Sequence, residues 1–189
     1  MLAWDKEGFH ELEDRIMATV AGKRPVKDVP YYYFLYDPRL ELLCLKEFRN
    51  LLGRLKAKGV SAECISLSRL MLETLRKLDC LTDSFLKEER SNRKIIFHDL
   101  ERELPKEIAS SLSNHLTGKD FSHCAILIRA GALFPFVHMS NLLSLLEGYV
   151  KSTLVIPYPG NREGEILNYR GESIKSYYRG EIININKEW

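Results

Sequence analysis

Short apolar runs of strand length alternate along this chain with longer segments whose apolar residues recur every three or four positions. The runs lie at 31–36, 60–67, 121–128 and 152–158. Within the third, Cys-Ala-Ile-Leu-Ile is an unbroken apolar stretch, typical of a parallel strand buried on both faces. Strands that alternate with helices predict an α/β fold. We expect a three-layer, Rossmann-like domain with a mostly parallel sheet of about four strands.

Helical spacing fills most of the chain between these runs. An amphipathic N-terminal helix is predicted to end near Gly22, and a second helix to follow Asp37-Pro38 and end at Lys58-Gly59. Ser68 is the expected N-cap of the next helix. The charged segment 81–93 is only weakly periodic, and a longer amphipathic pattern follows it, with Pro105 as a possible break.

The pattern changes after Pro159-Gly160. Two short strand-like runs, at 165–169 and 178–185, have no helix between them that is long enough for a crossover, which predicts an antiparallel edge or hairpin. The chain is therefore expected to be one α/β domain. Its parts are an N-terminal helix at 1–22, a connector at 23–30, a βα core at 31–158 and C-terminal antiparallel strands at 159–189.

Composition limits the classes of function. The 189 residues are 45% hydrophobic and 29% charged, as in ordinary globular domains, and the net charge of +2 supplies no strong field for nucleic acid or membrane. No apolar stretch is long enough for a membrane span. Asp5 stands where a signal peptide would need basic residues, so we expect a cytoplasmic protein.

Motifs that carry familiar chemistries are missing. The four cysteines form no C-x-x-C pair, and the five histidines show no i, i+4 ligand pairing, so neither a metal nor a redox site is predicted. The chain has no GxxxxGK[ST] phosphate loop, no GxGxxG fingerprint, and no GxSxG or HExxH motif. The sequence therefore predicts no catalytic residue and no cofactor.

The best candidate site lies where strands are expected to end. Carboxyl ends of parallel strands meet at one edge of a sheet, which would bring together Asp37, Arg129 with Gly131, and Pro159 with Gly160. Such an edge could hold a nucleotide or another small ligand. A structural interpretation competes with it, in which Asp37 caps the next helix, Arg129 pairs with a carboxylate and the glycines form turns.

Two further features have open interpretations. The C-terminal Tyr177, Tyr178 and Arg179 interleave aromatic and basic side chains, as single-strand nucleic-acid binders do, but the same residue types are enriched at protein interfaces. The helix after Asp37 carries basic residues that could contact a phosphate backbone or form a solvated face. These basic residues are Arg39, Lys46, Arg49, Arg54, Lys56 and Lys58.

Several segments in order resemble one known family. They are Pro-Tyr-Tyr-Tyr-Phe-Leu-Tyr-Asp-Pro at 30–38, Gly-Ala-Leu-Phe-Pro-Phe at 131–136 followed by Asn-Leu-Leu at 141–143, Tyr-Pro-Gly at 158–160 with Gly164, Asn168 to Gly171, and Tyr-Tyr-Arg at 177–179. In this order and spacing they resemble the BrxB family of bacterial BREX phage-defence systems, over nearly the whole chain.

The resemblance implies a small component of an antiviral defence complex without an established catalytic activity. Other members of such systems supply the chemistry: a DNA methyltransferase, a large ATPase and PglZ, an alkaline-phosphatase-like protein. It implies a non-enzymatic adaptor that binds a PglZ-like partner. The alternatives are a nucleotide- or small-ligand-binding α/β module and a DNA-binding accessory subunit.

Overall fold

The structure of the protein is a computed structural model that describes residues 4–23, 30–163, 166–169, 172–174 and 180–183. Five parallel strands form its main sheet: β1 (Tyr31–Tyr36), β2 (Ser61–Ser66), β3 (His123–Ile128), β4 (Thr153–Pro159) and β8 (Glu181–Ile182). Their order is β2-β3-β4-β1-β8, and the pairs between neighbours are parallel. The predicted α/β fold class is confirmed.

The C-terminal part matches the prediction only in part, since antiparallel strands are present but do not border the main sheet. The antiparallel strands β5 (Asn161–Glu163), β6 (Ile166–Tyr169) and β7 (Glu172–Ile174) form a separate three-stranded sheet and not an edge of the main one. β8 pairs with β1 in parallel and adds a fifth strand. A parallel strand requires a crossover connection, and the described part of this connection contains the small sheet.

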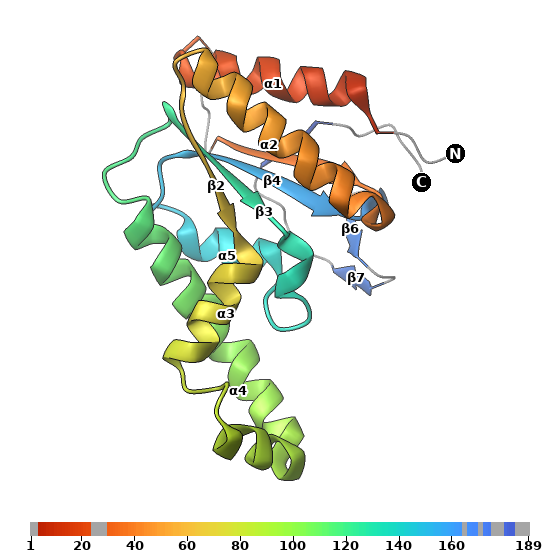
Figure 1. The fold of residues 1–189 in the computed structure, drawn as a ribbon, viewed down its shortest axis with the longest axis vertical. Coiled ribbons are helices and arrows are strands. Elements are labelled where there is room, and N and C mark those ends of the chain that lie inside the picture. The colour runs from red at the N-terminus through yellow and green to blue at the C-terminus, as the bar shows by residue number, and fades with distance from the viewer. Residues whose placement is uncertain (1–3, 24–29, 164–165, 170–171, 175–179, 184–189) are drawn as a thin grey trace.

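Helices cover both faces of the main sheet (Figure 1). The first face carries α1 (Lys6–Val20) and α2 (Glu41–Ala57), which follows a short 3-10 helix, η1 (Pro38–Leu40). The second face carries α3 (Leu67–Lys77), α4 (Asp83–His115) and α5 (Met139–Leu146), and a 3-10 helix, η2 (Ala130–Leu133), lies between β3 and α5. No helix in the ranges described is long and apolar enough to cross a membrane.

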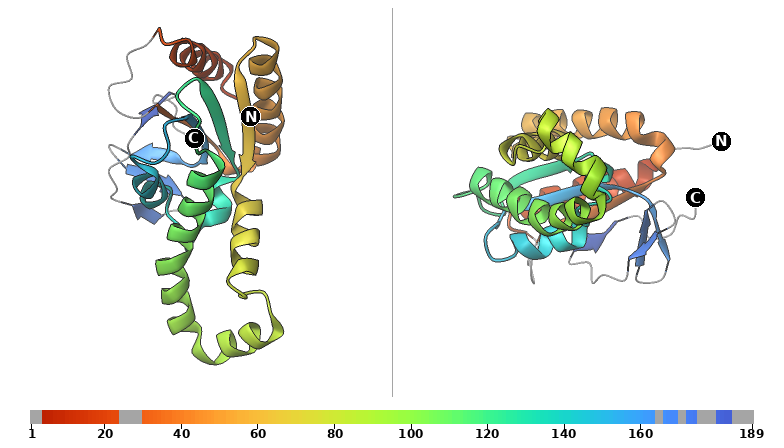
Figure 2. Two further views of the ribbon diagram at one scale, coloured as in Figure 1. Left: turned by 90° about the vertical axis from the view of Figure 1, so that its left-hand side faces the viewer. Right: turned by 90° about the horizontal axis from the view of Figure 1, so that it is seen from below.

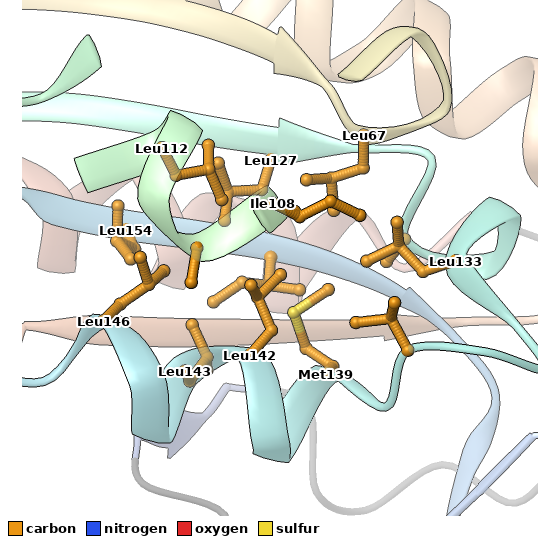
Figure 3. Close-up of a cluster of buried hydrophobic side chains, with 14 of the residues drawn as sticks. Leu67, Ile108, Leu112, Leu127, Leu133, Met139, Leu142, Leu143, Leu146 and Leu154 are labelled. Atoms are coloured by element: carbon orange, nitrogen blue, oxygen red, sulfur yellow. The ribbon is translucent and has the colours of Figure 1, made fainter. Parts of the chain in front are cut away.

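The aromatic strand β1 contributes to both hydrophobic cores. All six of its residues are buried, and its side chains alternate between the two faces. Tyr31, Tyr33 and Leu35 join the core under α4 and α5, and the other three residues join the core under α1 and α2. Figure 3 shows the first of these cores, where leucines of α5 pack against Ile108 and Leu112 of α4 and against the sheet.

The helices α3 and α4 extend from the body as a paired projection, hereafter the arm (Figure 2). The break in α4 falls at Asn92, whose φ of −125° and ψ of 32° are not helical, and not at Pro105, which the sequence offered as a possible break. Pro105 is buried beside Leu104 at the foot of the arm, where core packing maintains the helix around it. At Asn92 no such packing opposes a change of direction.

The N-caps of α3 and α4 each accept a hydrogen bond from a residue three positions further on, and the cap of α3 differs from the prediction. β2 runs into α3 without a loop, so Ser66 is both the last strand residue and the N-cap of α3, and its hydroxyl accepts the Arg69 N–H at 3.4 Å. Ser68, the predicted cap, lies inside α3. Thr82 caps α4 in the same way, with its hydroxyl accepting from the Phe85 N–H.

Candidate functional site

The carboxyl edge of the sheet brings together several residues that the sequence singled out. Tyr36 and Pro159 are partners in the β1–β4 register, and the Gly160 N–H donates to the Tyr36 carbonyl at 3.0 Å. Asp37 follows directly and is buried. Its carboxylate accepts the Arg39 N–H at 2.8 Å and the Arg39 guanidinium, and it caps η1. These hydrogen bonds lower the pKa of Asp37. The capping role of Asp37 is confirmed.

Arg129 lies on the same edge, with β4 between its strand and β1. It ends β3 in the left-handed conformation, at φ 62° and ψ 43°, and its side chain is exposed. In the part of the chain that the structure describes, its guanidinium has no carboxylate partner. Gly131 lies in η2. The other candidates, Gly164, Tyr177, Tyr178 and Arg179, lie outside the described residues.

Apart from Arg39, which pairs with Asp37, the basic residues after Asp37 divide into two groups. Arg54 and Lys58 pair with the buried Glu13 of α1, at 2.8 Å each, and hold α1 against α2. Burial alone would raise the pKa of Glu13, but hydrogen bonds and positive charge from Arg54 and Lys58 outweigh it and lower that pKa. Lys46, Arg49 and Lys56 are exposed, and none of the three has an ion-pair partner among the described residues.

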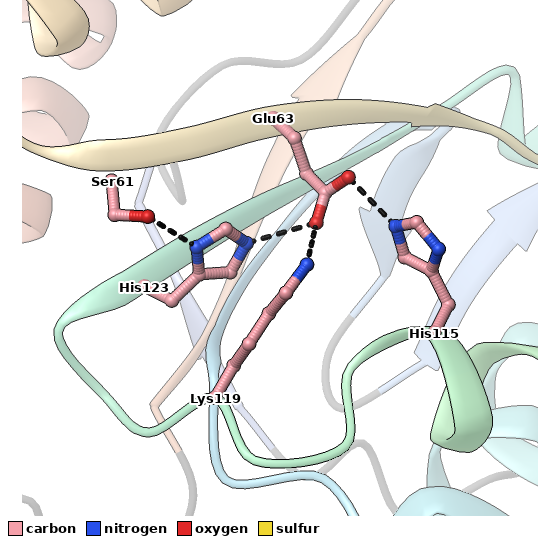
Figure 4. A network of polar contacts seen from close by, with 5 residues as sticks. All are labelled: Ser61, Glu63, His115, Lys119 and His123. Atoms are coloured by element: carbon pink, nitrogen blue, oxygen red, sulfur yellow. Dashed lines mark hydrogen bonds and ion pairs between the residues drawn. The ribbon is translucent and has the colours of Figure 1, made fainter.

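A polar cluster centred on Glu63 was not predicted from the sequence (Figure 4). Oε1 of Glu63 lies 2.9 Å from Nε2 of His123 and 2.5 Å from Nζ of Lys119, and Oε2 lies 2.7 Å from Nε2 of His115. Nδ1 of His123 lies 2.8 Å from the Ser61 hydroxyl. Ser61 and Glu63 project from one face of β2, and His123 is the register partner of Ser61 on β3.

The cluster keeps the Glu63 carboxylate in its ionised form. Partial burial alone would raise the pKa of Glu63, but hydrogen bonds donated by Lys119, His115 and His123 outweigh it and lower that pKa to about 2. The carboxylate is therefore ionised throughout the neutral range. Through these contacts Glu63 joins β2 to the last residue of α4, to the loop after α4 and to the start of β3.

The chemistry open to this cluster is limited by how the carboxylate is used. Hydroxyl, imidazole and carboxylate follow in the order that activates a serine nucleophile, but Glu63 also binds Lys119 and His115 and is not dedicated to orienting His123. Over the described ranges, no group of three or more His, Cys, Asp or Glu side chains could hold a metal ion. The arrangement is suited to fixing the position of β2.

An open hollow of about 480 Å³ lies beside this strand. β2, α3 and the C-terminal half of α4 form its walls. Its lining residues are Glu63, Cys64, Ile65, Ser66, Arg69, Leu70, Glu73, Thr74, Lys77, Ser111, Leu112 and His115. The hollow thus runs along a sheet strand that has a paired neighbour on one side only.

Large apolar side chains are exposed on the arm. The most exposed is Ile95, at 64%. The others on the arm are Leu72, Leu81, Leu86 and Phe97. Phe97 also contacts Phe136, with ring centroids 5.0 Å apart. The segment 81–95, which carries Leu81, Leu86 and Ile95, forms the outer part of the arm (Figure 2).

Fold and side chains together define a Rossmann-like α/β domain with a projecting helical arm. A family model described as "BREX protein BrxB" matches residues 63–183, more than half of the chain. The chain belongs to the BrxB family and is a component of a BREX system, in agreement with the resemblance noted from its sequence. Neither the curated proteins nor the solved structures gave a match.

Proposed function

We propose that this protein is a non-enzymatic adaptor of its BREX system and that it binds a PglZ-like protein of the alkaline-phosphatase superfamily. Family membership supports the place in the system. The chain carries none of the phosphate-binding or nucleophile motifs sought in it. At the sheet edge where a ligand would be expected, Asp37 is used as a cap and the Gly160 amide bonds to β1.

The observation that carries the adaptor role is the exposed apolar surface of the arm. Burial of a leucine or isoleucine side chain against a partner contributes about 1.5–3 kcal/mol. Leu81 and Leu86 lie at or next to the turn between α3 and α4, Ile95 lies just after the break at Asn92, and all three are at least 44% exposed. They add nothing to either core, and they are available to a protein partner.

Co-expression with the tagged PglZ-like product of the same system, followed by size-exclusion chromatography, tests the proposal. The wild-type chain is expected to co-elute at micromolar concentration. The double substitution Leu86→Glu with Ile95→Glu is expected to weaken binding at least tenfold, because it charges the arm surface. Leu42→Glu is the matched control, since Leu42 is 80% exposed on α2 and lies on the opposite face of the sheet. Separate elution of the wild-type proteins would contradict the adaptor role.

A further inference from the structure

We propose that the unpaired edge of β2 binds an extended, acidic segment of a partner protein, which adds to the main sheet as a sixth strand. This inference deepens the adaptor role proposed above and rests on it. It concerns a second surface, separate from the exposed side chains of the arm tip. An adaptor that joins two proteins needs two such surfaces.

The edge of β2 has neither the bulges nor the prolines that often block strand addition. β2 is the first strand in the order of the sheet, and all six of its residues are in register with β3, so it has no bulge. It contains no proline, and its only charged side chain is Glu63. That carboxylate is held by His115, Lys119 and His123. Proteins normally protect such edges with bulges, prolines or outward-facing lysines.

An open hollow lies along the edge strand on the side of α3 and α4. The 480 Å³ hollow follows β2 from Glu63 to Ser66 and has α3 and α4 as its far wall. Ile65 and Leu70 are only partly buried there, and both pack against the core below. An added strand would bond its backbone to β2 and place alternate side chains over these two residues, as in other cases of strand addition.

Charge around the edge indicates the composition of the segment. Arg49 and Lys56 lie on α2, which packs against β2 on the face that Cys64 occupies. Burial raises the pKa of the Cys64 thiol to about 11, and the charges of Arg49 and Lys56 act against that rise. Both side chains are exposed, and neither has an ion-pair partner in the described part of the chain. On the other side of β2, Arg69 pairs with Glu73. Two uncompensated cations beside an open strand favour a segment that carries carboxylates.

The same charges disfavour a second copy of this chain as the occupant. Pairing of β2 with β2 of another copy would place Arg49 and Lys56 of both copies around one junction. Like charges brought together in this way are destabilising. We therefore assign the edge to an acidic segment of a different protein.

Peptide binding to the full-length chain tests this assignment. The probe is a fluorescein-labelled peptide of nine residues in which Glu alternates with Val, and the comparison peptide has Lys in place of Glu. The acidic peptide is expected to bind at least tenfold more tightly. It is also expected to slow amide hydrogen exchange in residues 61–66, because the outward-facing amides of β2 gain acceptors.

Charge reversal locates the binding surface. Arg49→Glu with Lys56→Glu is expected to lower the affinity for the acidic peptide at least tenfold while the melting temperature stays unchanged, because both side chains are exposed. Lys87→Glu is the control, because Lys87 is an exposed cation on the outer part of the arm, away from β2, and it is expected to change affinity less than twofold. Equal affinity for the two peptides, or unchanged exchange in 61–66, overturns the proposal. Protection of 61–66 that rises with protein concentration alone identifies a second copy and also overturns it.

The outcome is distinguishable from the test of the adaptor role. If the chain co-elutes with the PglZ-like protein but fails the peptide experiment, the strand-addition surface is wrong and the adaptor role stands. If it binds the acidic peptide along β2 but does not co-elute, the proposed partner is wrong and the surface stands.

Discussion

At the scale of single residues, Glu63 shows how one carboxylate joins distant parts of the chain. Its partners His115, Lys119 and His123 lie 52, 56 and 60 positions away. Such separations leave no spacing pattern in a sequence, so the cluster could not be predicted. The cap at Asp37 was predictable, because its partner is two residues away and the Asp-Pro step is itself a helix-start signal.

Glu63→Gln is expected to lower the free energy of unfolding by about 1–2 kcal/mol at pH 7, because it replaces charge-assisted hydrogen bonds at a partly buried site. The folded-state pKa lies below the unfolded value, so the ionised carboxylate stabilises the fold above about pH 4.3. That contribution is lost as the pH falls towards 2. Urea unfolding of wild type and variant from pH 7 to pH 2 checks this.

Glu73→Gln is the control, because Glu73 belongs to an exposed pair with Arg69. Its effect is expected to stay below about 0.5 kcal/mol. If the difference in unfolding free energy between wild type and Glu63→Gln stays constant from pH 7 to pH 2, the carboxylate charge is not what stabilises the cluster.

At the scale of elements, the arm combines a buried base with an exposed tip. Leu104, Ile108 and Leu112 of α4 are buried in the core, whereas nearly all residues from 81 to 95 are exposed. The exposure of this segment also explains the weak helical periodicity of 81–93. A helix that packs against nothing needs no apolar stripe, so sequence patterning identifies it poorly. The foot of α4, which packs against α5, showed a clear pattern and was predicted.

Native-state hydrogen exchange of the isolated protein is expected to follow this division. Amides at 81–95 should exchange at least a hundredfold faster than those at 104–112, because opening the tip exposes little buried apolar surface. Binding of the partner to the arm should slow exchange at the tip and leave 104–112 unchanged. Uniform protection along α4 in the isolated chain would mean that the tip is packed as firmly as the base.

At the scale of the whole molecule, β1 completes the sheet. It pairs with β4 on one side and β8 on the other, and its side chains enter both cores. The family match spans 63–183 and so includes β4 and β8 but not β1. In this fold those two strands are held in one sheet through the N-terminal part of the chain.

The sequence predicted β1 because six consecutive aromatic or aliphatic residues have few other stable conformations. It also predicted the helices on both faces and the parallel pairing, which follow from apolar periodicity. β8 was not predicted as a parallel strand, since two residues carry no periodicity and their pairing depends on where the chain returns in space. For the same reason the sequence predicts an antiparallel edge or hairpin in this region but not a sheet separate from the main one.

Gly180 tests how closely β8 must approach β1. Its φ is +137°, and a Cβ there would lie 2.9 Å from the Tyr31 carbonyl oxygen and 3.1 Å from a ring carbon of Tyr33. Gly180→Ala is expected to cost about 2–3 kcal/mol, from backbone strain together with displacement of β8. The hydrogen bond that the Ile183 N–H donates to the Tyr33 carbonyl should weaken, so this amide should exchange faster.

Gly148→Ala separates the two causes, because Gly148 also has a positive φ, +79°, but no neighbouring atom lies within 4 Å of the position that a Cβ would take there. It is expected to cost only about 1 kcal/mol and to leave exchange at Ile183 unchanged. Urea unfolding of both variants, with exchange measured at Ile183, checks the pair. If both substitutions cost the same and exchange at Ile183 is unaffected in each, the close contact with Tyr31 and Tyr33 does not hold β8 in the sheet. A larger cost for Gly180→Ala, with faster exchange at Ile183, would establish that β8 is an integral part of the sheet built on β1.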